Sequence, residues 1–213
     1  RLIFKKSLIT IVVIAEVIQK DELLGRGLAP DVHIEWMAGP ALLPGAAAIF
    51  DLLNMVDQYP ADWFEKSEQL LFINQVEYVN VSWPAHFIRI NGWPGFLQRP
   101  LLEASAKDPV IRTRAAIIQE AINKQFSWVD DIPGFLSPRV LAAIINEAYL
   151  SLEEEVSTKE EIDTAMKLGT NYPFGPFEWA VRIGIERIYE LLKEMAVKDK
   201  HYEPAALLKK EAR

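Results

Sequence analysis

The hydrophobic pattern divides the chain into two parts with different periodicities. The first part contains short apolar runs, rich in β-branched residues, that are separated by polar segments. Such runs are typical of strands buried in a parallel sheet. After Pro133 the apolar residues recur every three or four positions, which is the pattern of amphipathic helices. We therefore predict an α/β domain at 1–132 and an all-helical domain at 133–213, with the boundary near Asp130–Pro133.

The first part is expected to alternate strands with helices, which implies a parallel sheet with helices packed on it. The predicted strands are Leu8–Ile14, Val32–Trp36, Leu70–Ile73, Phe87–Ile90 and Gln125–Val129. The predicted helices are Glu16–Gly25, Gly45–Asp57 and Pro109–Asn123.

The start of the chain permits a second interpretation. Arg1, Lys5 and Lys6 precede the apolar run Leu8–Ala15, as positive residues precede the apolar core of a signal peptide. The run has about eight residues, whereas a membrane helix needs ~20. Because the run is rich in β-branched residues and no small-residue cleavage pattern follows, we expect a buried strand and no membrane partner.

Local signals in the second part predict where its helices begin and end. Ser137 followed by proline predicts a helix start, and Ser157–Glu161 contains two overlapping capping boxes for a second helix that would end at Gly169. Tyr172–Phe177 holds two prolines and a glycine and is predicted to be a turn. The third helix is expected to bury one stripe, formed by Val181, Ile185, Ile188, Leu192 and Met195.

Composition excludes several classes of function. The net charge is −7 and no basic stripe is visible, which argues against a nucleic-acid partner. Cysteine is absent, which excludes disulfides and thiolate sites and is compatible with the cytoplasmic location that we expect. The three histidines, His33, His86 and His201, are far apart, so no metal site is predicted.

Two motifs of the second part resemble the C-terminal domain of 3-hydroxyacyl-CoA dehydrogenases. Ile162–Gly169 reads IDTAMKLG and Tyr172–Glu178 reads YPFGPFE, and both follow the turn Pro133–Phe135 in the family's order and spacing. The resemblance covers 133–210 and is weaker over 1–132. It implies a Rossmann-like parallel-sheet domain followed by an all-α domain of the 6-phosphogluconate dehydrogenase C-terminal-like type. It also implies a homodimer formed through the C-terminal helices.

The resemblance further implies NAD-linked oxidation of 3-hydroxyacyl-CoA in fatty-acid metabolism. In the family, a histidine paired with a downstream glutamate removes the hydroxyl proton while hydride leaves for NAD. By order along the chain, Asn91 stands at the histidine position and Glu103 at the glutamate position. Asn74 and Trp93 are the candidate substrate contacts. Each has a structural alternative: a turn for the asparagines, a core side chain for Trp93, and a solvated acid for Glu103.

The sequence departs from the family where the chemistry would occur. Ala15–Lys20 follows the first strand in place of the G-x-G-x-x-G turn, so the backbone cannot approach a pyrophosphate closely and Glu16 would repel it. No cofactor-binding residue is therefore assigned. Asn91 has an amide with no useful pKa near neutrality and cannot be a general base.

The residues leave alternatives open. One is a divergent dehydrogenase that uses NAD. Another is a catalytically inactive, dimeric ligand-binding or regulatory protein on the same fold, without NAD, that binds an acyl-CoA or another small ligand. A third is a purely structural assembly partner.

Overall fold

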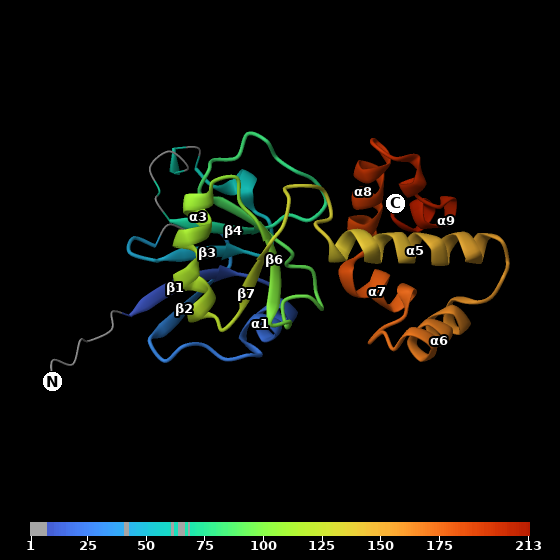
Figure 1. Cartoon of the computed structure of the whole chain (residues 1–213), viewed down its shortest axis with the longest axis horizontal. Coiled ribbons are helices and arrows are strands. Elements are labelled where there is room, and N and C mark those ends of the chain that lie inside the picture. Colours follow the sequence, from blue (N-terminus) through green and yellow to red (C-terminus); the bar gives the residue numbers. More distant parts are fainter. Residues whose placement is uncertain (1–7, 41–42, 61, 64–66, 68) are drawn as a thin grey trace. The chain divides into compact units, whose positions relative to one another are not determined.

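The computed structural model describes residues 8–40, 43–60, 62–63, 67 and 69–213. The chain forms two compact units, each considered by itself below. The sheet unit comprises the residues up to Gln75 together with Asn80–Asp131, and the helical unit comprises Val76–Val79 with Ile132–Arg213. Figure 1 shows strands and helices in the first unit and helices in the second.

In the part of the sheet unit that the structure describes, seven strands form one sheet in the order β2-β1-β3-β4-β5-β6-β7. Neighbouring strands are parallel except β5 and β6, which are antiparallel. The predicted Rossmann-like parallel sheet is thus confirmed except at the antiparallel pair β5–β6. The strands are β1 (Ile9–Ile14), β2 (Val32–Met37), β3 (Ala48–Asp51), β4 (Leu70–Asn74), β5 (Phe87–Ile90), β6 (Leu101–Ser105) and β7 (Gln125–Trp128).

The predicted helix at Gly45–Asp57 is wrong. The structure has β3 there, followed by the short 3-10 helix η1 (Val56–Gln58). Alanines favour a helix locally, but β3 lies between β1 and β4, and Ala48, Ile49 and Phe50 are fully buried. A short apolar run of this kind fits a strand covered on both faces as well as a helix, and the sheet decides between them.

Both faces of the sheet are covered, and alternate strand residues point to opposite faces. Ile11 and Val13 of β1 pack on the face covered by α1 (Val17–Leu24), α3 (Pro109–Arg114) and α4 (Ala116–Ala121). Figure 1 shows α3 lying across the strands. Val12 and Ile14 pack on the other face, which is covered by Tyr59, Trp63 and η1. In place of the single helix predicted at Pro109–Asn123, the structure has two short helices, α3 and α4.

The helical unit contains the predicted helices with corrected ends. Its elements are α5 (Ser137–Glu153), α6 (Lys159–Thr170), α7 (Pro176–Ile183), α8 (Ile185–Ala196), η2 (Lys200–Tyr202) and α9 (Ala206–Glu211). Ser137 is the first helical residue rather than the N-cap. α6 continues past Gly169 and ends at Thr170, and its C-cap residue Asn171 adopts a left-handed conformation (φ 55°). The third predicted helix is divided at Gly184, whose φ of 100° suits glycine.

This division changes which residues share a buried stripe. Ile188, Leu192 and Met195 are buried on α8 as predicted, but Val181 lies on α7 and is 85% exposed. The turn between α6 and α7 also ends earlier than predicted, because Pro176 and Phe177 are already helical. None of the helices in the described ranges is long and apolar enough to cross a membrane.

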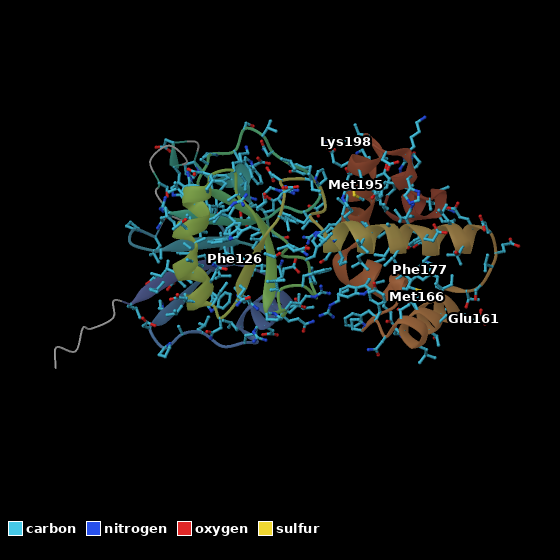
Figure 2. The ribbon with its side chains drawn as sticks, in the orientation of Figure 1. Phe126, Glu161, Met166, Phe177, Met195 and Lys198 are labelled. Atoms are coloured by element: carbon cyan, nitrogen blue, oxygen red, sulfur yellow. The ribbon has the colours of Figure 1, made fainter. Side chains whose placement is uncertain are left out.

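The motif residues Asp163 and Gly175 hold α6 and α7 together. The two oxygens of the buried Asp163 carboxylate accept hydrogen bonds from the backbone N–H groups of Phe177 (2.8 Å) and Glu178 (3.2 Å) at the start of α7. A side chain on Gly175 would collide with Asp163. The ring of Phe177 contacts Tyr149 of α5, with ring centroids 5.0 Å apart, and lies beside α5 in Figure 2. The motif therefore acts in packing.

Candidate functional site

The strand order places one candidate site at the ends of four parallel strands. The chain crosses from one side of β1 to the other between β2 and β3, and α/β sheets bind ligands beyond the carboxyl ends of the strands at such a crossover. We call this region the carboxyl edge. It consists of the residues that end or follow β1, β3, β4 and β5, namely Ala15–Gln19, Leu52–Asn54, Asn74–Gln75 and Asn91–Gly95.

The structure brings Asn91 and Glu103 together. Asn91 follows β5, and because β6 runs antiparallel to β5, Glu103 in the middle of β6 lies beside it. The Asn91 amide Nδ2 donates to Glu103 Oε2 at 3.3 Å, and the Asn91 backbone N–H donates to the Glu103 carbonyl at 3.0 Å. Both side chains are buried. Glu103 is thus a strand residue with an amide partner, not a solvated acid.

Asn74 is also at the carboxyl edge, and its side chain bonds to two neighbouring segments. Its Nδ2 donates to the Leu52 carbonyl at 3.0 Å, and its Oδ1 accepts from the Gly92 backbone N–H at 3.0 Å. Gly92 is required there, since a Cβ would lie 2.8 Å from Asn74 Cγ. Asn74 therefore connects the ends of β3, β4 and β5 through main-chain partners.

Trp93 is completely buried, at 0% exposed. Its backbone N–H donates to Asn91 Oδ1 at 3.4 Å. A direct contact between Trp93 and a substrate stays a prediction, and the burial is what a core tryptophan would show.

Sequence reasoning missed two polar residues of α1, Gln19 and Glu22, which are 1% and 7% exposed. Gln19 Nε2 donates to the carbonyls of Leu52 and Gly92, each at 3.1 Å, and both Glu22 carboxylate oxygens lie 2.8 Å from the Gly95 backbone nitrogen. The signal was present in the spacing, since positions 19 and 22 share one helical face with the buried Leu23.

Asp51, the last residue of β3, is fully buried beside the carboxyl edge. One carboxylate oxygen accepts from the Met55 N–H at 2.8 Å, while the other, Oδ1, has no hydrogen-bond partner among the described residues. Burial raises the pKa of Asp51 to about 6, against the lowering effect of backbone hydrogen bonds. Its carboxylate raises the pKa of Tyr59 further, beyond the effect of that phenol's own burial.

A hollow of about 870 Å³ lies elsewhere on the sheet unit. Arg26, Lys124 and Phe126 are among the residues that line it, and Phe126 is labelled in Figure 2. Burial lowers the pKa of Lys124 to about 8, with a smaller contribution from Arg26. The Lys124 ammonium donates to the carbonyls of Leu97 (2.5 Å) and Arg99 (3.3 Å). This lysine therefore has a structural role in the loop before β6.

No histidine lies at the carboxyl edge, and the nearby acid whose pKa is raised toward neutrality is Asp51. His86 precedes β5 at the opposite end of that strand from Asn91, and burial lowers its pKa. His33 lies in β2 and is exposed. Within the described ranges, no three His, Cys, Asp or Glu side chains are grouped as metal ligands. The arrangement has a buried carboxylate and amides, but no imidazole beside Glu103.

The comparison with protein families identifies the helical unit. Residues 134–213 match the family model of the 3-hydroxyacyl-CoA dehydrogenase C-terminal domain. The resemblance inferred from the IDTAMKLG and YPFGPFE motifs is thereby confirmed, and this part of the chain is similar to that domain.

Similar proteins carry related names. The chain is 39% identical over 114 residues to 3-hydroxyadipyl-CoA dehydrogenase of Escherichia coli K12, covering 52% of this chain and 24% of that protein. It is 39% identical over 95 residues to a probable 3-hydroxybutyryl-CoA dehydrogenase of Bacillus subtilis, covering 44% of this chain and 33% of that protein. The matches thus span a quarter to a third of these relatives.

The solved structure of FadB2 from M. tuberculosis superimposes with a TM-score of 0.71 at 16% identity. The match covers 96% of this chain and 93% of that chain. At this identity the likeness shows that the fold of both units is shared.

Proposed function

We propose that this chain is a 3-hydroxyacyl-CoA dehydrogenase-like protein that serves as a homodimeric ligand-binding or regulatory module and does not itself catalyse hydride transfer. The observation that carries the proposal is the pairing of Asn91 with Glu103. Oxidation of a hydroxyl group by hydride loss requires a group that accepts the hydroxyl proton. The Asn91 amide donates to Glu103 and has no basic atom to offer at neutral pH.

The competing function is a divergent dehydrogenase that uses NAD with 3-hydroxyacyl-CoA substrates. It is favoured by the family match over 134–213 and by the position of Glu103, whose carboxylate could accept a proton if a substrate displaced Asn91. Acyl-CoA or a related small ligand is the ligand class proposed for both alternatives. The cytoplasm is the proposed location, supported by the absence of cysteine from the sequence.

An oxidation assay separates the two functions. Pure protein is incubated with acetoacetyl-CoA and NADH, and NADH absorbance is followed beside a Glu103→Gln variant. We expect no turnover above the protein-free rate for either protein. Turnover by the unmodified chain that falls at least tenfold in Glu103→Gln would establish the dehydrogenase and refute the proposal.

Homodimerisation is supported by apolar side chains at the surface of the helical unit. Val156, Leu168, Val181 and Val197 are each more than two-thirds exposed. Small helical domains have limited cores, and burial of such side chains against a second copy would stabilise them. We expect light scattering at micromolar concentration to give twice the chain mass. A monomer under these conditions would remove the dimer from the proposal.

A further inference from the structure

The carboxyl edge can be tested for the cofactor that its fold implies. In Rossmann-like folds the pyrophosphate of a dinucleotide lies at the N-terminus of the first helix, close to a glycine-rich turn. Here that turn has no glycine, and the N-cap of α1 is Glu16, whose exposed carboxylate would repel the phosphates. The residues at this position therefore do not fit a dinucleotide.

Gln19 is hydrogen-bonded to the backbone groups that a ligand at this position would need. Its Oε1 accepts from the backbone N–H of Glu16 at 3.1 Å, and its Nε2 donates to the carbonyls of Leu52 and Gly92. One buried amide thus connects the turn after β1 to the ends of β3 and β5. In a dinucleotide site, a backbone N–H at this position would point at the pyrophosphate. Here the N–H of Glu16 donates to the Gln19 side chain instead.

Asn74 and Glu22 complete the same connection from two other positions. Asn74 bonds to the carbonyl of Leu52 and the N–H of Gly92, two residues that Gln19 also contacts. Glu22 accepts from the N–H of Gly95, one turn of α1 beyond Gln19. Each of the three side chains is more than nine-tenths buried. We call Gln19, Glu22 and Asn74 the internal clamp.

We infer that the internal clamp closes the carboxyl edge and that the chain does not bind NAD. The three buried side chains hydrogen-bond to backbone groups of the carboxyl edge. A dinucleotide would have to break these bonds without replacing them. Such unsatisfied buried groups cost more than a normal hydrogen bond contributes. Asn74, a candidate substrate contact by resemblance, consequently has a structural role here, because it connects the ends of β3, β4 and β5.

The test combines ligand titration with matched variants. NADH is added up to millimolar concentration while melting temperature and NADH fluorescence are recorded; saturation at 100 times Kd would raise Tm by about 5–10 °C. We expect no shift and no saturable fluorescence change. Gln19→Met should lower Tm by at least about 5 °C, whereas Gln58→Met, at an exposed position on η1, should change it by less than about 2 °C.

Saturable NADH binding would overturn the inference, and so would equal melting temperatures for Gln19→Met and Gln58→Met. If Gln19→Met does not fold, amide hydrogen exchange of the unmodified protein gives the answer: the N–H groups of Glu16, Gly92 and Gly95 should be protected, and rapid exchange at all three would refute the clamp. The inference that the chain does not bind NAD supports the proposed function, but different results would refute each of them. NADH binding without turnover refutes only the closure, whereas turnover refutes the proposed function as well.

Discussion

The helical unit and the carboxyl edge of the sheet unit differ in how closely each follows the dehydrogenases that the chain resembles. In the helical unit the motif residues make the contacts that their sequence predicts: Asp163 binds the start of α7, and Gly175 leaves the space that this contact requires. At the carboxyl edge, polar residues of this chain bond to one another where cofactor and substrate contacts would be expected. A shared fold is therefore strong evidence for packing and weak evidence for chemistry.

The largest effect is expected from removing the contact that defines the helical unit. Asp163→Ala should lower the free energy of unfolding by about 2–3 kcal/mol, because two helix N–H groups lose a buried carboxylate partner. Thr164→Ala, at the next and exposed position of α6, should cost less than about 0.5 kcal/mol. Urea denaturation measures both. Equal effects would mean that the motif does not stabilise this unit.

A second prediction concerns the buried acid beside the carboxyl edge. The pKa of Asp51 is about 6 when folded and about 3.9 when unfolded, so its stabilising contribution is complete below the unfolded value and is lost as pH rises to about 6. The Asp51→Asn variant has no ionisable group at this position. Its stability relative to the unmodified chain should therefore rise by about 2 kcal/mol between pH 4 and pH 7.

Denaturation at both pH values checks the Asp51 prediction. Asp21→Asn, which removes an exposed carboxylate on α1, is the control and should change stability by less than about 0.5 kcal/mol at either pH. A pH-independent difference between Asp51→Asn and the unmodified chain would show that Asp51 is already satisfied when charged, and the sheet edge would then resemble the helical unit in being fully paired.

The smallest effect is expected at the surface of the helical unit. Lys167 pairs with Glu178 at 2.5 Å, and this hydrogen bond is the main reason that the pKa of Glu178 is lowered. Both side chains are at least about one-third exposed, so Lys167→Ala should cost about 0.5 kcal/mol or less in chemical denaturation. If Lys167→Ala cost as much stability as Asp163→Ala, the Lys167–Glu178 ion pair would stabilise the motif as much as the buried Asp163 carboxylate does, which would contradict this account.

The sequence allowed prediction of elements whose signals are local. The Thr158–Glu161 capping box starts α6 as expected, and the β-branched run before Ala15 forms β1. It did not allow prediction of β3, since alanines near Ile49 satisfy either a helix or a buried strand until both neighbouring strands are known.

The candidate site was predictable to a similar extent. The order of motifs placed Asn91 and Glu103 at the family's paired positions, and in the structure Asn91 Nδ2 lies 3.3 Å from Glu103 Oε2. Their functional roles stay predictions. The spacing of Gln19 and Leu23 indicates a shared helical face, but it does not identify the distant partners of Gln19. Leu52 and Gly92 lie on turns far from Gln19 in the sequence, and only the strand order makes them its neighbours. Contacts between distant turns carry no periodic signal.

The most direct test of the central claim is acetoacetyl-CoA reduction by the unmodified chain and by Asn91→His, measured side by side through NADH oxidation. Asn91→His places an imidazole beside Glu103 but leaves Gln19, Glu22 and Asn74 unchanged. The amide at position 91 predicts no turnover by the unmodified chain, and the internal clamp predicts that neither protein exceeds the protein-free rate. Turnover by the unmodified chain would contradict the account of the carboxyl edge as packed structure without hydride chemistry.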